Sequence, residues 1–151
     1  MDFPGLKNLG SADLATINAA TALAVITSAA DAQGVNQGYV ENLDGMLSAT
    51  LSASFVYGSG GDTLKVVVET SLNQGATWVE VARFAFAQAS AEKVVNLSAL
   101  TAVTTVYAPT ALSDDTVKDG ILGPRWRARI LKGGGAAYAG NTSLAVRMVA
   151  R

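Results

Sequence analysis

Residues Leu47–Tyr57 decide the fold of this chain, and they read Leu-Ser-Ala-Thr-Leu-Ser-Ala-Ser-Phe-Val-Tyr. Apolar residues occupy the odd positions, and serine or threonine occupies the even positions from 48 to 54. A period of two is typical of a β-strand with one side buried and the other facing water. The pattern recurs in Thr63–Thr70, Trp78–Phe86, Arg125–Leu131 and Ser143–Ala150, so the sequence predicts an all-β protein.

Shorter stretches complete the predicted strands: Thr21–Thr27, Tyr39–Leu43, Glu92–Leu97 and Val103–Ala108. Glycine turns at Gly58–Asp62 and Asn73–Gly75 predict an antiparallel meander of the three strands that they join. About eight or nine short strands with glycine turns predict a single antiparallel β-sandwich or jelly-roll-like domain over residues 21–151. Residues 109–123 are its longest predicted surface loop.

Residues 1–20 lack this alternation and form a predicted N-terminal arm, either extended or short-helical. Ser11–Asp13 could cap a helix that begins near Leu14. We expect the arm to pack on a neighbouring subunit or a larger assembly, with Phe3 and Leu6 in the contact, rather than to join its own sheet.

The apolar faces of the most regular strands predict the hydrophobic core. Its expected members are Leu51, Phe55, Val66, Val68, Trp78, Phe84, Trp126, Ile130, Leu144 and Val146.

The composition excludes several classes of function. The chain has no cysteine and no histidine, so disulfides, thiol nucleophiles, Cys/His zinc sites and histidine acid/base catalysis are absent. Its longest apolar stretch, Leu14–Ala30, contains Asn18 and several threonines, so we expect neither a membrane span nor a secretory signal.

Charge is distributed unevenly along the chain. Residues 1–119 carry twelve acids and five bases, and residues 120–151 carry six bases and no acid. The bases Arg125, Arg127 and Arg129 alternate with apolar residues and should share one strand face. Because the bases form no continuous run and the isoelectric point is about 5.3, nucleic acid is not an expected partner.

This arginine face has two interpretations. In the first, it is an interface at which at least one arginine contacts a carboxylate of another subunit, since a guanidinium pairs with a carboxylate through two parallel hydrogen bonds. In the second, it is a solvent face balanced by acids on adjacent strands of the same chain, such as Glu69 or Glu80.

Other motifs are less specific. Gly58–Gly61 and Gly133–Gly140 lack the lysine and the helix of a phosphate-binding loop and are better explained as turns. Asp114, Asp115 and Asp119 could gather around calcium, although their spacing fits no EF-hand loop. Four aromatic residues at strand spacing could form a carbohydrate platform, but such residues more often pack in a core: Trp78, Phe84, Phe86 and Tyr107.

No pair of acids stands out as a catalytic pair. The sequence therefore predicts a protein that is not an enzyme, with no catalytic residue, no cofactor-binding residue and no metal site.

The run Thr70–Phe86, with Asn73-Gln74-Gly75 followed by Thr77-Trp78 and an alternating strand, resembles a segment of tailed-bacteriophage structural proteins. Further stretches are similar to the same group: Asn42–Met46, Tyr57–Gly61 and, near the end of the chain, Arg127–Arg129 with Gly140–Leu144. In that group Asp-Gly often stands where this chain has Asn73-Gln74. The resemblance covers roughly residues 40–150 and implies a virion component rather than an enzyme.

The expected function is that of a phage virion structural protein, most simply a capsid decoration (cement) protein. It would be made in the host cytoplasm and bind the major capsid protein or other virion proteins as a homo-oligomer, with a trimer favoured. The alternatives are a tail, neck or fibre-base virion protein and a carbohydrate-binding β-sandwich module.

Overall fold

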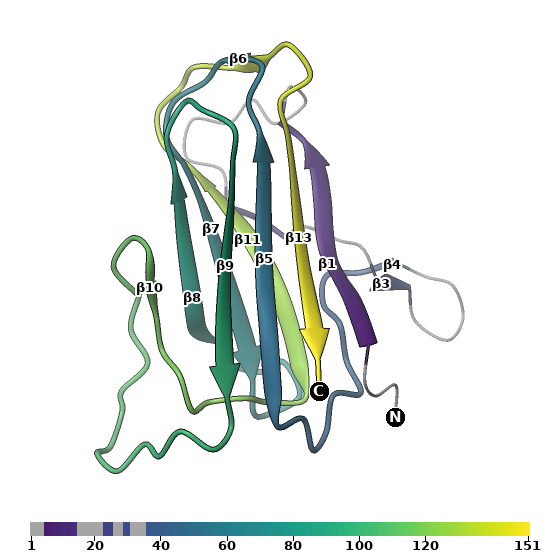
Figure 1. Cartoon of the computed structure of the whole chain (residues 1–151), viewed down its shortest axis with the longest axis vertical. Helices are drawn as coiled ribbons and strands as arrows, with labels where there is room; N and C mark the ends of the chain where they lie inside the picture. The colour runs from purple at the N-terminus through teal and green to yellow at the C-terminus, as the bar shows by residue number, and fades with distance from the viewer. Residues whose placement is uncertain (1–4, 15–22, 26–28, 31–35) are drawn as a thin grey trace.

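Two antiparallel sheets pack face to face in the computed structural model, which describes residues 5–14, 23–25, 29–30 and 36–151 (Figure 1). Sheet A has the strand order β1-β13-β5-β9, with bounds Gly5–Asp13, Ser143–Ala150, Ser48–Val56 and Ala91–Ser98. Sheet B has the order β10-β8-β7-β11-β2, with bounds Thr116–Val117, Val79–Phe86, Leu64–Ser71, Arg125–Lys132 and Leu23–Val25. The all-β, antiparallel sandwich predicted from the sequence is confirmed.

Two short strand pairs lie outside these sheets. They are β6 with β12, spanning Ser59–Gly60 and Tyr138–Ala139, and β3 with β4, spanning Ala29–Ala30 and Asn36–Gln37.

The core lies between the inner faces of the two sheets. Strand β5 alternates between buried and half-buried residues along its length, as the period of two predicts. Nine of the ten predicted core residues are at most 5% exposed, including Phe55, Phe84 and Trp126. The Trp126 indole N–H also donates to the carbonyl of Gly123 at 2.7 Å, so this buried ring keeps its polar atom satisfied.

Trp78 is the exception, because a β-bulge reverses the side-chain alternation of the strand that follows it. The register of β8 against β7 shifts between Val68 and Glu69, so that Ala82 pairs with Val68 and Glu80 with Glu69. The extra residue, Val81, is buried like Ala82. Trp78 therefore lies on the outer face of sheet B, and its assignment to the core is wrong.

The predicted three-strand meander is also wrong. Strands β7 and β8 form the expected hairpin, but β5 belongs to sheet A and pairs with β13 and β9. The chain crosses from sheet A to sheet B through residues 57–63. A glycine turn between two alternating strands is compatible with a hairpin and with a crossover, so the pattern alone did not distinguish them.

Two glycine-rich stretches pack against each other at this crossover. Strand β6 pairs with β12, and a Cβ on Gly58 would lie 1.7 Å from the carbonyl oxygen of Gly140. A Cβ on Gly61 would overlap the ring of Tyr138 at 2.1 Å. The N–H groups of Gly58 and Gly61 donate to Thr142 and Ala137. These glycines serve close backbone packing, which supports the interpretation of both stretches as turns.

The N-terminal arm joins the sandwich. Strand β1 pairs with β13 from Gly5↔Ala150 to Asp13↔Ser143, and Leu9 and Leu14 are buried in the core. The prediction that residues 1–20 avoid their own sheet is therefore wrong for residues 5–14, of which Gly5–Asp13 form a strand. The helix expected after Ser11–Asp13 falls mainly on residues 15–20, which lie outside the described residues. A bulge between Asn8 and Gly10 interrupts the alternation, which hid this strand in the sequence.

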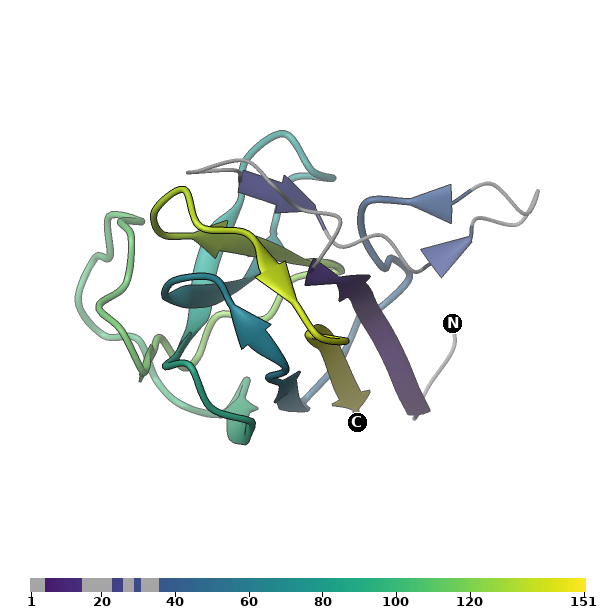
Figure 2. The ribbon, with the colours of Figure 1, turned by 90° about the horizontal axis from the view of Figure 1, so that it is seen from above.

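Two shorter predictions need correction, and one is partly outside the described residues. Tyr39–Leu43 contributes only a single bridge, Val40↔Trp126. Val103–Ala108 is not a strand and belongs to a connection, residues 99–115, that projects from one side of the sandwich (Figure 2). Strand β2 lies within the predicted Thr21–Thr27, whose other residues the structure does not describe.

Candidate interaction surface

The three predicted arginines lie on the outer face of sheet B. Along β11, Arg125, Arg127 and Arg129 are half-buried while the alternate residues Trp126 and Ala128 are fully buried. Strand β7 runs beside β11 and places Glu69 directly opposite Arg127. The sequence thus predicted the common face of the arginines correctly.

Glu69 is shared by two of the arginines. The Nε of Arg127 lies 2.5 Å from one oxygen of Glu69, and Arg129 donates to the other oxygen. The Glu69 side chain is only 4% exposed. Arg127 also lies over the ring of Trp78, 4.1 Å from its centroid, where a guanidinium gains cation–π attraction.

Arg125 has a different set of partners. It forms an ion pair with Glu41 at 3.2 Å, lies 4.8 Å from the ring centroid of Tyr39 and donates to the carbonyl of Gln74. Every arginine of the face therefore forms an ion pair with a carboxylate of its own chain. Glu69 is one of the two acids that the sequence suggested as partners. Contact of an arginine with another subunit stays a prediction.

The other acid, Glu80, is directly opposite Glu69 in the ladder between β7 and β8. It is held by Arg83 at 2.9 and 3.0 Å and also accepts the N–H of Leu112 at 2.8 Å. Sequence reasoning singled out no pair of acids, because the bulge at Val81 sets this register. Two adjacent carboxylates would repel each other, and the three guanidinium groups around them offset that repulsion.

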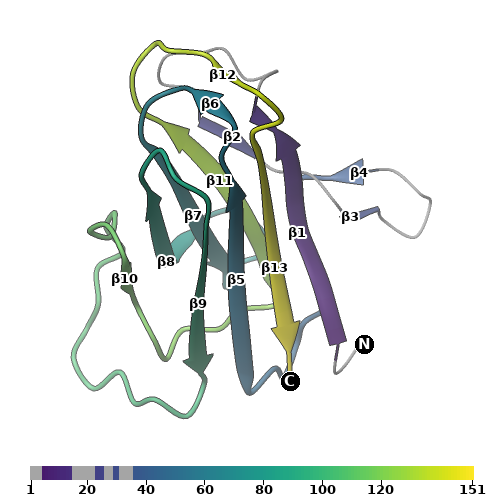
Figure 3. The same ribbon diagram turned by 45° about the horizontal axis from the view of Figure 1, so that its top comes forward.

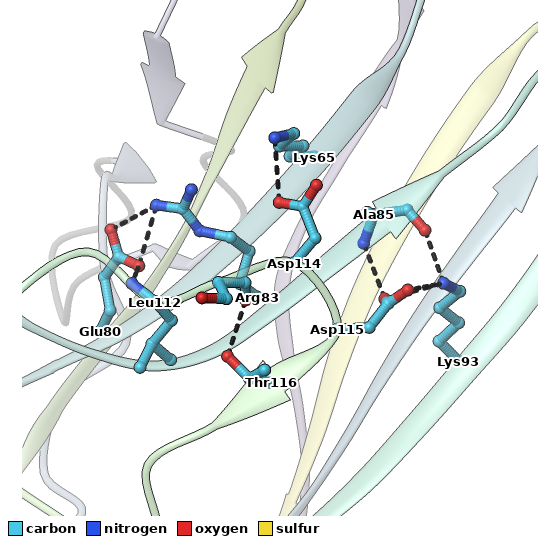
Figure 4. A network of polar contacts seen from close by, with 10 residues as sticks. Lys65, Glu80, Arg83, Ala85, Lys93, Leu112, Asp114, Asp115 and Thr116 are labelled. Atoms are coloured by element: carbon cyan, nitrogen blue, oxygen red, sulfur yellow. Dashed lines mark hydrogen bonds and ion pairs between the residues drawn. The ribbon is translucent and has the colours of Figure 1, made fainter.

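The long connection between β9 and β10 covers part of this face (Figure 4). Asp114 pairs with Lys65 at 2.9 Å, and Leu112 is bound to Glu80. Residues 109–111 line a small cavity of about 160 Å³ together with Glu69, Trp78 and Glu80. Val67, which lies on the outer face of β7, is only 1% exposed. The arginine face is thus largely a buried, internally paired surface.

The acids at the end of this connection and just after β10 bind separate partners. Asp115 accepts the N–H of Ala85 at 3.0 Å and both of its oxygens lie 2.7 Å from the Nζ of Lys93; these bonds hold its pKa below the ordinary value. Burial opposes ionisation of Asp119, but hydrogen bonds from Ser98, Thr101 and Gly120 outweigh it, so its pKa is also lowered. Among the described residues no group of acids could hold a metal ion, which counts against the calcium interpretation.

The structure does not assemble the predicted carbohydrate platform. Phe84 and Phe86 are at most 5% exposed and belong to the core, as the more common interpretation of such aromatics requires. Trp78 lies against Arg127, and Tyr107 lies beneath the ammonium of Lys118 at 4.4 Å from its ring centroid.

Of the two predicted arm contacts, the structure describes only Leu6. Leu6 lies in β1 opposite Val149 and is 66% exposed, so it is available on the outer face of the sheet. Phe3 lies outside the described residues.

Among the described residues, the most exposed large apolar side chains lie in the connection after β9, which contains the wrongly predicted strand Val103–Ala108. Leu100 is 81% exposed and Val106 is 99% exposed, both in the connection after β9. The chain has no charged residue between Lys93 and Asp114. This uncharged run was the available sequence signal, because an uncharged exposed loop is unusual on a free surface.

Comparison with protein-family models, curated proteins and solved structures found no match to this chain. Over the residues that the structure covers, no helix has the length and apolar character needed to cross a bilayer.

Proposed function

We propose that this protein is a structural component of a tailed-phage virion, most simply a capsid decoration protein that binds the assembled shell as an oligomer. The observation that carries the proposal is the exposed connection after β9, which has no charged residue from position 99 to position 113. Leu100, Val103 and Val106 project from it, and apolar groups exposed in this number favour contact with another protein.

The connection is fixed to the sandwich at both of its ends, which suits a docking surface. Near its start, Asp119 binds the N–H of Ser98 and the hydroxyl of Thr101, both at 2.7 Å. Near its end, the ion pairs of Asp114 and Asp115 hold it to β7 and β9. A surface that is already ordered loses little conformational entropy on binding.

The resemblance of Thr70–Phe86 to phage structural proteins supports the same class. That run forms the β7–β8 hairpin, in which the Asn73 side chain binds Thr77 at 2.8 Å and the Ser71 hydroxyl accepts the N–H of Gly75 at 2.8 Å. The motif therefore builds a turn whose polar side chains are used within the turn. Head, tail, neck and fibre-base proteins could all use such a hairpin.

Cryo-EM of purified particles tests the class directly. The protein should be found at regular positions on the capsid surface, and its location on a tail or neck would select the alternative virion role. Its absence from particles would refute the proposal. A glycan array then tests the carbohydrate-binding module, which should bind sugars in isolation.

A pair of variants tests the docking surface. Leu100→Asp combined with Val106→Asp should leave the fold intact, because both side chains are already exposed, and should abolish binding to undecorated shells in co-sedimentation. Leu72→Asp is the matched control, since Leu72 is 63% exposed on the β7–β8 turn. Equal binding by the double variant and the wild type would place the contact elsewhere.

A further inference from the structure

The sandwich has one sheet edge that is long, regular and open. Of the described edge strands, β10 has two residues and β2 has three, and β1 carries a bulge between Asn8 and Gly10. Strand β9 instead has eight residues and pairs with β5 without a bulge, and no strand of sheet A follows it (Figure 3). Such an edge is a template for another strand unless it is blocked.

The hydrogen bonds at the end of β9 show which of its backbone groups are open. The N–H of Ala99 binds Leu47 of β5, whereas the N–H of Ser98 points the other way and binds Asp119 at 2.7 Å. Because these directions alternate along a strand, the N–H and C=O groups of Glu92, Val94 and Asn96 face the open edge. Asp119 ends this stretch at Ser98.

The open stretch is self-complementary. In an antiparallel pairing about a two-fold axis through Val94, that residue faces Val94 of the second copy and Glu92 faces Asn96. All three open residues then form hydrogen-bonded pairs, each pair exchanging two backbone hydrogen bonds. A shift by two residues in one direction would oppose Lys93 to Lys93, and a shift in the other would use Ser98, whose N–H is already occupied.

The side chains fit the same register. Thr50 donates to the Oδ1 of Asn96 at 2.7 Å, which leaves the amide Nδ2 of Asn96 to donate elsewhere. Ser52 donates to Oε1 of Glu92 at 2.7 Å and holds that carboxylate on the outer face of the sheet. Asn96 of one copy can therefore donate to Glu92 of the other, and the charge on that acid strengthens the bond.

We propose that β9 pairs with β9 of a second copy, joining the two A sheets into one eight-stranded sheet across a two-fold axis. Val94, which is 59% exposed, would be covered at the centre of this contact. A cavity of about 520 Å³ flanks the edge and is lined by Phe84, Val95 and Val117 with Lys93 and Asp115 beside them, so the added strand would also cover apolar surface. This inference does not rest on the proposed virion role.

The first test is the oligomeric state of the full chain by sedimentation velocity over a range of concentrations. The wild type should form a dimer in a concentration-dependent way. Val94→Lys should lose the dimer, because it places two ammonium groups opposite each other at the axis. Val56→Lys is the matched control: Val56 is 50% exposed on the outer face of β5, and its change should leave the dimer intact.

Val94→Cys tests the register. The chain has no other cysteine, and residues in a hydrogen-bonded antiparallel pair have Cα atoms about 5.5 Å apart, within the range that a disulfide spans. Mild oxidation should convert this variant to a dimer linked by a disulfide. The control Val56→Cys should form no disulfide-linked dimer under the same conditions.

A wild type that sediments as a monomer at every concentration would overturn the proposal, as would a dimer or trimer that survives Val94→Lys. Failure of Val94→Cys to cross-link a protein that does dimerise would reject this register. None of these results bears on the particle-binding test of Leu100 and Val106, so failure of either proposal can be told from failure of the other.

Discussion

The outer faces of the two sheets contrast sharply, although both come from strands with one polar side. On sheet A, β5 presents Ser48, Thr50, Ser52 and Ser54, short side chains that leave the face open. On sheet B, β7 and β11 present Glu69 and the arginines, which pair with each other and lie partly beneath the connection after β9. Sheet A therefore has one buried face, and sheet B has its inner face buried and much of its outer face as well.

This contrast shows what a polar position in a strand can mean. Ser52 on the outer face of sheet A donates to Glu92, but water can replace this exposed hydrogen bond, so the identity of the side chain should matter little to stability. Glu69 is nearly buried and depends on its two arginines, because an ionised group removed from water without a partner is costly. Measurements that compare the two sheets should separate these roles.

The largest effects should come from the inner faces, where the two sheets are equivalent. Phe55 of sheet A and Trp126 of sheet B are each at most 1% exposed. Replacement of either by alanine should lower the free energy of unfolding by about 3–5 kcal/mol, as expected for a large buried aromatic. Chemical denaturation would measure this, and unchanged stability in both variants would refute the packing of the sandwich.

The next largest change in the free energy of unfolding should distinguish the two outer faces. Glu69→Ala should cost about 2–3 kcal/mol, somewhat below the loss expected on breaking a fully buried pair, because Arg127 and Arg129 keep partial contact with water. Ser52→Ala on sheet A should change stability by less than about 0.5 kcal/mol. Equal effects of the two changes would show that the face of sheet B is not buried in solution.

The same reasoning revises what charge reversal at Arg127 should do. If Arg127 only contacted another subunit, as the interface interpretation of the sequence has it, Arg127→Glu would leave the isolated fold intact. In the structure the new carboxylate would lie beside Glu69, so the variant should instead be destabilised before any binding is measured.

A third comparison concerns two glycines, Gly61 in the crossover that links the sheets and Gly45 in the turn before β5. Gly61 and Gly45 both have positive φ, at 68° and 74°, but a Cβ on Gly61 would overlap Tyr138 while one on Gly45 would meet nothing within 4 Å. Gly61→Ala should therefore cost about 1–3 kcal/mol more than Gly45→Ala, the usual penalty for overfilling a packed site. Similar melting temperatures would mean that Tyr138 moves aside freely.

The sequence was sufficient to locate the long strands and their buried faces wherever the alternation was unbroken. It predicted β5, β11 and β13, most of the core and the common face of the arginines, because a period of two and burial on one side are local properties. It failed at the two bulges, Leu9–Gly10 and Val81, since one extra residue reverses every side chain beyond it.

The candidate surface depends on contacts between residues that are far apart in the sequence. The partner of each arginine depends on strand order, and so does the open edge at β9. The covering of sheet B depends on a connection in which the sequence wrongly predicted a strand. Its acids bind Lys65, Ala85 and Lys93, which lie far away along the chain. These contacts follow from the register of paired strands, which a single sequence does not specify.

The smallest expected effect concerns that connection, which should detach in acid while the sandwich persists. Asp115 and Asp119 both have pKa values below 3.8, so their stabilisation is complete above that pH and is lost as the pH falls through the folded-state values. In an NMR titration the amides of Ala85 and Ser98, which donate to these two acids, should therefore shift with midpoints below 3.8.

Asp115→Asn should loosen the connection already at neutral pH, seen as faster hydrogen exchange at Ala85, whereas Asp44→Asn in the exposed turn before β5 should not. Midpoints at or above 3.8 would mean that neither acid holds the connection, and the outer face of sheet B would then be as open as that of sheet A.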